Sequence, residues 1–280
     1  MNKLNMDLLN QWLGKEETTK TVLAVETADL MNATLNRPAK FKKGDELPPA
    51  WHWLYFHEPV VGDKLGVEGH PELGQFMPPV SFGGGLPPRR MWAGGKLVWK
   101  RPLRLGDYAS KTSRIKSIVE KNGRSGALCF VLVEHEISVG GNVCLQEEQT
   151  IVYREPVQAG GKAAQASPAP TNADFSASHT PDPIMLFRYS ALTFNGHRIH
   201  YDVDFCREHE GYPGLVVHGP LIATLLLDLF YQQGRQISEF SYRGRSPLFN
   251  PNPFSVHGTA DGQAWASNYA GGLAMTAQIK

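Results

Sequence analysis

The chain has 280 residues, of which 41% are hydrophobic and 20% are charged, an ordinary composition for a folded protein with one large domain or two smaller ones. Its formal net charge is only +1, so no overall field favours nucleic acid or an anionic membrane as a partner. Three cysteines without metal-ligand spacing, and no apolar run of membrane-spanning length, predict a cytoplasmic protein with reduced, buried thiols and no metal site.

The first half is expected to contain helices and then an antiparallel meander. Hydrophobic periodicity predicts helices over residues 5–14 and 18–35, and the aromatic run 51–56 predicts a strand. The Gly/Pro-rich segment 62–88 reads as a flap rather than a phosphate loop, because no helix follows its glycine triplet. Strands with turn dipeptides at their joints are then expected over residues 109–120, 125–139 and 143–154.

Residues 157–180 are small and rich in Pro, Gly and Ser, which predicts a linker between residues 1–156 and residues 181–280. The second part begins with an expected strand over residues 185–190, and a strongly apolar helix follows from Pro220 to about Gln233. Strands are expected over residues 237–243, 254–261, 263–270 and 273–279. Both halves therefore read as one long helix followed by antiparallel strands.

A polar cluster, Asn-Gly-His-Arg-Ile-His-Tyr-Asp over residues 195–202, precedes the apolar helix, which His218, Gly219 and Pro220 open. Histidine can accept and return a proton near neutral pH, and a helix N-terminus favours developing negative charge. An isolated histidine would more often be packed and inert, and a Gly-Pro pair can be a plain break before a helix. The combination of the two stretches favours a catalytic site.

These two stretches resemble the MaoC-like, type 2 enoyl-thioester hydratases, whose motif Asp-x-Asn-Pro-x-His is followed by a His-Gly before the central helix. The wording of residues 190–202 resembles the branch with the type 2 hydroxyacyl-thioester dehydratases and the mesaconyl-C4-CoA and itaconyl-CoA hydratases. The resemblance implies an α+β double hot-dog fold, in which two central helices are each wrapped by an antiparallel sheet. Residues 1–156 would be a degenerate hot-dog domain, and residues 181–280 the catalytic one.

The resemblance implies that His200 is the acid/base residue and that Gly219 donates its N–H to the thioester oxygen. Asn195 stands where the family has Asp, and it could orient water or simply form a turn. His197 or Asp202 could supply the missing acid/base function, although each could equally be a cap. Otherwise His200 makes both proton transfers on one face, which gives syn addition.

The resemblance predicts hydration of an α,β-unsaturated acyl-CoA. The substrates that it favours are mesaconyl-C4-CoA and itaconyl-CoA, which would give citramalyl-CoA. Coenzyme A is then part of the substrate, and no separate cofactor is expected. Several arginines could bind CoA phosphates or a terminal carboxylate, although solvated surface arginines are more common: Arg89, Arg90, Arg198, Arg243 and Arg245.

Three other functions stay open at this point. One is a general 3-hydroxyacyl-thioester dehydratase of fatty-acid metabolism. The others are a hot-dog thioesterase and a non-catalytic acyl-CoA-binding module, because a fold alone does not fix an activity. No nucleic-acid or membrane partner is expected, and a homodimer is one open option.

Overall fold

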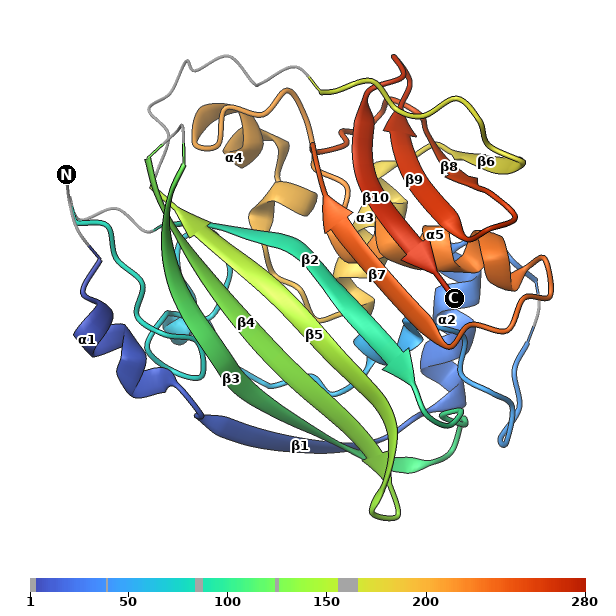
Figure 1. Ribbon diagram of the computed structural model, residues 1–280, viewed down its shortest axis with the longest axis horizontal. Coiled ribbons are helices and arrows are strands. Elements are labelled where there is room, and N and C mark those ends of the chain that lie inside the picture. Colours follow the sequence, from blue (N-terminus) through green and yellow to red (C-terminus); the bar gives the residue numbers. More distant parts are fainter. Residues whose placement is uncertain (1–3, 39, 84–87, 124–125, 156–165) are drawn as a thin grey trace.

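The computed structural model describes residues 4–38, 40–83, 88–123, 126–155 and 166–280. Its strands pair antiparallel in one ten-stranded sheet within this part of the chain, in the order β1-β3-β4-β5-β2-β7-β10-β9-β8-β6 (Figure 1). The strands are β1 Glu16–Val22, β2 Arg89–Trp99, β3 Tyr108–Gly123, β4 Gly126–Val139, β5 Asn142–Arg154, β6 Phe175–His179, β7 Glu239–Gly244, β8 Phe254–Gly258, β9 Gln263–Asn268 and β10 Leu273–Ile279.

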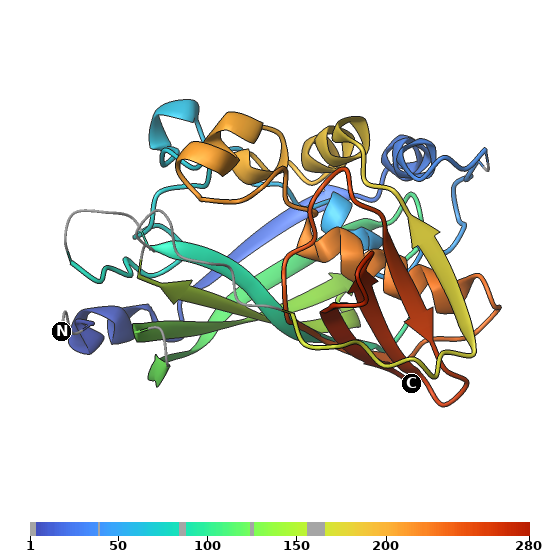
Figure 2. The same ribbon diagram turned by 90° about the horizontal axis from the view of Figure 1, so that it is seen from above.

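The helices lie on one side of this sheet, except for the first, which lies apart from the others near the N-terminus (Figure 2). They are α1 Met6–Leu9, α2 Val25–Thr34, α3 Pro183–Leu192, α4 Val203–Glu208 and α5 Gly219–Tyr231, with 3-10 turns η1 Asn10–Trp12, η2 Trp51–Leu54, η3 Gly62–Lys64 and η4 Arg198–His200. Helix α5 lies between the sheet and an outer layer that holds α2, α3 and α4 (Figure 2). The view in Figure 1 therefore looks onto the outer face of the sheet.

Helix α5 is the centre of the second half. Its ten residues from Leu221 to Phe230 are all buried, and all of them except Thr224 and Asp228 are apolar. Pro220 lies in its first turn, where a missing N–H costs nothing. Strands β7 to β10 contact one side of it. The helix expected from Pro220 is confirmed, and the strands expected after it are confirmed in position.

The two halves are joined through the sheet itself. Strand β2 of the first half pairs with β7 of the second, with Gly94 opposite Arg243 and Leu97 opposite Phe240. The ladder therefore continues without a gap from the long strands of the first half to the short strands of the second (Figure 1). The meander predicted over residues 109–154 is confirmed as β3, β4 and β5.

Two expected elements near the N-terminus are wrong. Residues 18–35 were expected to form one helix, but β1 ends at Val22 and α2 begins at Val25. The run Thr-Thr-Lys-Thr-Val alternates exposed and half-buried positions, and its β-branched residues fit a pleated edge. The aromatic run 51–56 is not a strand, because its first four residues form the 3-10 turn η2.

The strand expected over residues 185–190 is also wrong, since these residues belong to α3. Asp182 caps this helix by accepting a hydrogen bond from the Met185 N–H, and Pro183 occupies its first turn. The expected linker 157–180 lies partly outside the described residues, and its end forms β6, which pairs with β8 at the edge of the sheet.

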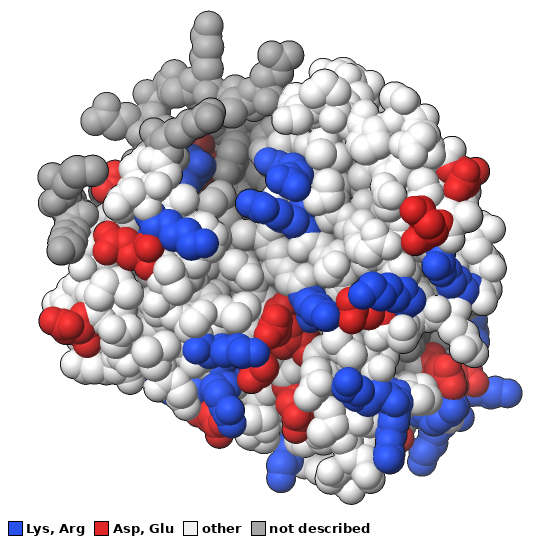
Figure 3. All heavy atoms as spheres, in the orientation of Figure 1, with Lys and Arg blue, Asp and Glu red and all other residues white. Residues whose placement is uncertain are grey.

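Cys129, Cys144 and Cys206 are free and buried, as expected. Within the described residues, no helix has the length and apolar character needed to span a membrane. On the outer face of the sheet, basic and acidic side chains are interspersed rather than gathered by sign (Figure 3). This distribution agrees with the net charge of +1.

Candidate functional site

His200, the last residue of η4, lies buried at the N-terminal end of α5. Its Nδ1 lies 2.8 Å from the carbonyl oxygen of Val216. A carbonyl can only accept, so Nδ1 carries the hydrogen and Nε2 keeps its lone pair. No described residue hydrogen-bonds to Nε2. Burial lowers the pKa of His200 to about 4, and the bond to Val216 opposes this only in part. The ring is therefore a neutral base with one free nitrogen.

His218 stacks on His200, with ring centroids 3.6 Å apart and planes inclined by 18°. Its Nε2 lies 2.8 Å from the hydroxyl of Ser190 on α3. Its Nδ1 is buried and has no partner among the described residues. Burial, and then the charges that His200 and His197 would carry, lower the pKa of His218 well below its ordinary value. A charge on His200 would thus disfavour protonation of the ring stacked on it.

Two further histidines extend this pair into a row. His197 lies with its ring centroid 5.5 Å from that of His200, and His70 lies 4.3 Å from His197. Burial lowers the pKa of His197 to about 3. His70 comes from the Gly/Pro-rich segment expected to be a flap, whose residues 84–87 lie outside the described residues. Sequence reasoning missed His70, because no local pattern marks it.

Gly219 is the first residue of α5, as expected, and no described residue accepts a hydrogen bond from its N–H. A Cβ on Gly219 would lie only 2.8 Å from Cε3 of Trp92. Trp92 of β2 in turn stacks on Tyr242 of β7, with centroids 4.5 Å apart. Glycine is therefore needed at the head of α5 also because an indole from the first half packs against it.

The remaining predicted residues of the motif are held in local structure. Asn195 Oδ1 accepts a hydrogen bond from the His197 N–H at 3.0 Å, which is the turn role that was one of its two readings. Asp202 caps α4 by accepting from the Phe205 N–H, and its other oxygen pairs with Arg198 at 2.7 Å. Arg198 also donates to the Val67 carbonyl. Both side chains are occupied by these contacts.

The other candidate arginines divide by exposure. Arg243 and Arg245 are exposed. Arg89 pairs with Glu210 at 3.1 Å and lies over the ring of Tyr212. Arg90 is half-buried, and none of the described carboxylates forms an ion pair with it.

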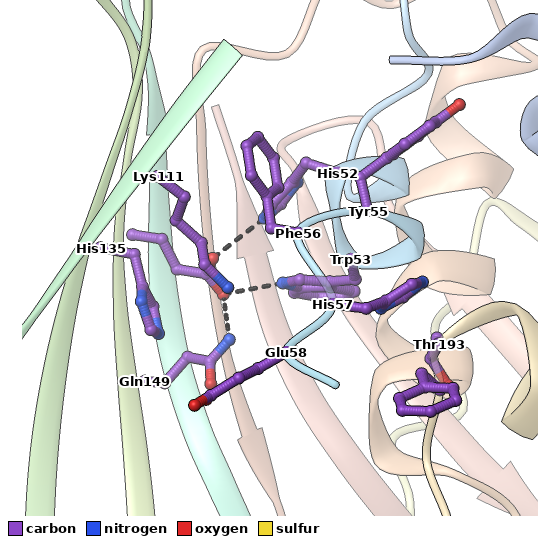
Figure 4. A pocket seen from close by; sticks show the side chains of 12 residues that line it. His52, Trp53, Tyr55, Phe56, His57, Glu58, Lys111, His135, Gln149 and Thr193 are labelled. Atoms are coloured by element: carbon purple, nitrogen blue, oxygen red, sulfur yellow. Dashed lines mark hydrogen bonds and ion pairs between the residues drawn. The ribbon is translucent and has the colours of Figure 1, made fainter. Parts of the chain in front are cut away.

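A second polar group lies in the first half around Glu147 of β5 (Figure 4). This carboxylate is 2% exposed. It accepts hydrogen bonds from Trp53 Nε1 at 2.8 Å and Gln149 Nε2 at 2.7 Å, and it lies 2.9 Å from His52 Nε2. Burial alone would raise the pKa of Glu147, but His52 and the hydrogen bonds lower it to about 2. These contacts fix η2 against the sheet.

Glu147 lies in the wall of a cavity of about 220 Å³ whose other side is formed by Thr193 and Phe194, directly before Asn195. Lys111 also lines it, and burial lowers the pKa of its ammonium group. The first half contains no motif like that of residues 195–202, so the sequence alone marks no partner for His52. The structure instead gives His52 a buried carboxylate from a strand 95 residues away. Within the described residues, no group of side chains has the arrangement of a metal site.

Comparison with known proteins finds relatives of this chain among hydratases and dehydratases. Residues 50–250 match the family model described as hydroxyacyl-thioester dehydratase type 2. The mesaconyl-C(4)-CoA hydratase of Chloroflexus aurantiacus is 42% identical over 254 residues, which cover 88% of this chain and 86% of that protein.

Solved structures at lower identity agree in fold. A MaoC-like dehydratase from Phytophthora capsici superposes with a TM-score of 0.67 at 14% identity, covering 98% of both chains. A Mycobacterium tuberculosis protein described as having a double hotdog fold superposes with a TM-score of 0.54 at 10% identity, covering 95% of both chains. The expected double hot-dog fold is confirmed.

Proposed function

Since the chain belongs to the type 2 hydroxyacyl-thioester dehydratase family, we propose that His200 and Gly219 catalyse the reversible addition of water to an α,β-unsaturated acyl-CoA. The observation that carries this assignment is the 2.8 Å contact between His200 Nδ1 and the Val216 carbonyl oxygen, which determines the tautomer. The Nδ1–H of His200 is fixed on the Val216 carbonyl, which leaves Nε2 as an unprotonated base at the head of α5.

In this reaction Nε2 of His200 accepts a proton from water while the water oxygen attacks Cβ of the enoyl group. Electron density moves through Cα to the thioester oxygen, which gains enolate character. The imidazolium then returns the proton to Cα, so one water is added and the histidine is regenerated. Because one residue serves both steps on one face, the addition is syn. A low pKa of His200 makes the imidazolium a strong acid for the second step.

The Gly219 N–H supports the developing negative charge. It lies in the first turn of α5, where N–H groups without helical partners and the helix dipole both favour an anion. Asn195 keeps its side-chain N–H group for water or the thioester, since only its Oδ1 is engaged within the described residues. Arg198 and Asp202 position η4 and α4 rather than touch substrate.

For the acyl group we propose a short, branched dicarboxylic chain. The relative that is 42% identical over most of its length is a mesaconyl-C(4)-CoA hydratase, which supports the same substrate class here. Absorbance of the conjugated thioester tests this directly. Mesaconyl-C4-CoA should lose its enoyl band without release of thiol. Release of thiol would indicate a thioesterase, and no change with any of several enoyl-CoAs would indicate a binding protein.

The pH profile of hydration should place its acidic limb far below pH 6.5. Nε2 must be unprotonated in the free enzyme, and the pKa of His200 is about 4, so kcat/KM falls only as pH drops toward 4. Between about pH 5.5 and 8 the rate should stay nearly constant, because His200 is already unprotonated throughout this range. A histidine with the ordinary pKa near 6.5 would instead lose activity as the pH falls through it. A half-maximal rate near pH 6.5, in protein that circular dichroism shows to be folded, would contradict the assigned environment.

A further inference from the structure

Arg90 differs from the other arginines that the sequence analysis named as candidates for binding substrate. Arg198 and Arg89 are held by carboxylates of this chain. Arg90 is half-buried, yet no described carboxylate pairs with it. A partly desolvated guanidinium without a counter-ion is unfavourable unless a ligand supplies one.

The strand register directs Arg90 toward the interior. On β2 it stands directly opposite Tyr153 of β5, and directly opposed residues of an antiparallel pair project from the same face. Tyr153 is 1% exposed, and its hydroxyl has no partner among the described residues. The Arg90 guanidinium and the Tyr153 hydroxyl are thus carried by neighbouring residues on the inner face of the sheet.

The charge of Arg90 also acts on the far end of the histidine row. It contributes, after burial, to lowering the pKa of His70, and, after burial and the charge of His200, to lowering the pKa of His197. For His200 the causes are burial and the Val216 bond. Glu68 adds one negative charge near Tyr153, and its carboxylate lies against Gly66, where Oε2 is buried without a hydrogen-bond partner among the described residues.

The spacing along β2 fits a short dicarboxylic chain. Trp92, two residues beyond Arg90, projects from the same face and lies against Gly219. Two residues of strand advance about 6–7 Å. The two carboxyl carbons of a four-carbon backbone are separated by three carbon–carbon bonds of about 1.5 Å, or about 4 Å in a trans arrangement. The length of the arginine side chain makes up the difference between these two distances. One carboxyl end of the acyl group can therefore lie at Gly219 and the other at Arg90.

We propose that Arg90, assisted by the Tyr153 hydroxyl, is a carboxylate-binding subsite that selects dicarboxylic acyl chains, an inference that rests on the proposed hydratase function. The thioester lies at Gly219, the double bond at His200, and the free carboxylate between the guanidinium and the phenol. An uncharged chain would leave both groups desolvated and unpaired, which disfavours it more than a missing methyl group would.

The test compares mesaconyl-C4-CoA with crotonyl-CoA, which lacks the carboxylate. In Arg90→Gln, kcat/KM for mesaconyl-C4-CoA should fall about 10²-fold, the scale for losing one partner of a buried charge pair, while crotonyl-CoA changes less than about threefold. Arg90→Lys should lose less, because it keeps the charge without the bidentate geometry. Arg188→Gln, which removes an exposed arginine on α3, is the matched control and should leave both rates unchanged.

Tyr153→Phe separates binding from folding. Because the hydroxyl has no partner among the described residues, its removal should not lower Tm, yet it should reduce kcat/KM for mesaconyl-C4-CoA about tenfold and leave the rate with crotonyl-CoA unchanged. Equal losses with both thioesters in Arg90→Gln and Arg90→Lys, or no loss with either, would refute the subsite alone. A wild-type protein that hydrates neither thioester would refute the proposed function and the subsite with it.

Discussion

Replacement of His200 by Asn is expected to reduce kcat about 10²- to 10⁴-fold, the range for loss of a general acid/base. Asparagine can place an amide N–H near the position of Nδ1, so the hydrogen bond to the Val216 carbonyl can be kept. What disappears is Nε2, the only atom assigned to move the proton. The measurement is the initial rate of loss of the enoyl band at saturating mesaconyl-C4-CoA.

His209→Asn is the matched control, since His209 is exposed at the end of α4 and its ring contacts only Phe205 among the described aromatic residues. Its rate should equal that of the wild type. If His200→Asn keeps its Tm and turns over within about threefold of the wild type, His200 does not carry the proton, because a general acid/base contributes at least about 10²-fold. Its stacked neighbour His218, with an unpartnered Nδ1, would then be the next candidate.

The sequence was sufficient where a local pattern determines the structure. Eight apolar side chains among the ten buried residues 221–230 identify α5 without further help. The Gly140-Gly141 turn between β4 and β5 consists of two residues with positive φ, which glycine adopts without strain. The short apolar run 185–190 was misassigned, because such a run fits a strand or a buried helix equally well. The cap Asp182-Pro183 was the signal that would have corrected it.

In the candidate site, too, the residues that are close in sequence could be predicted, and those that only the fold brings together could not. Asn195, His200 and Gly219 lie within 25 residues of one another, so their grouping was visible in the sequence. His70 and the His52–Glu147 pair were not, because each joins segments that only the sheet and the covering loops bring together. The arginines could be named as a set, but exposure and ion pairing were needed to distinguish Arg90 from the rest.

Removal of the Glu147 side chain is expected to be the most destabilising single change in the first half. Glu147→Ala leaves Trp53, His52 and Gln149 without the acceptor that they share. Loss of one partner from a buried charged network costs about 3–5 kcal/mol of unfolding free energy. The adjacent Glu148 projects from the opposite face, its side chain is 40% exposed, and among the described residues it pairs only with Lys116. Glu148→Ala should therefore cost less than about 1 kcal/mol.

Urea unfolding of the two variants at several pH values tests the network. The pKa of Glu147 is about 2 when folded and near 4.5 in an unfolded chain, so its contribution is full above pH 4.5 and is lost as pH falls toward 2. The difference in unfolding free energy between the wild type and Glu147→Ala should accordingly be constant at neutral pH and shrink below pH 4.5. If Glu147→Ala unfolds at neutral pH with the same free energy as Glu148→Ala, the carboxylate does not hold η2 against the sheet. The cavity beside Phe194 would then owe its shape to the apolar contacts of Trp53 with Trp92 and Tyr242 alone.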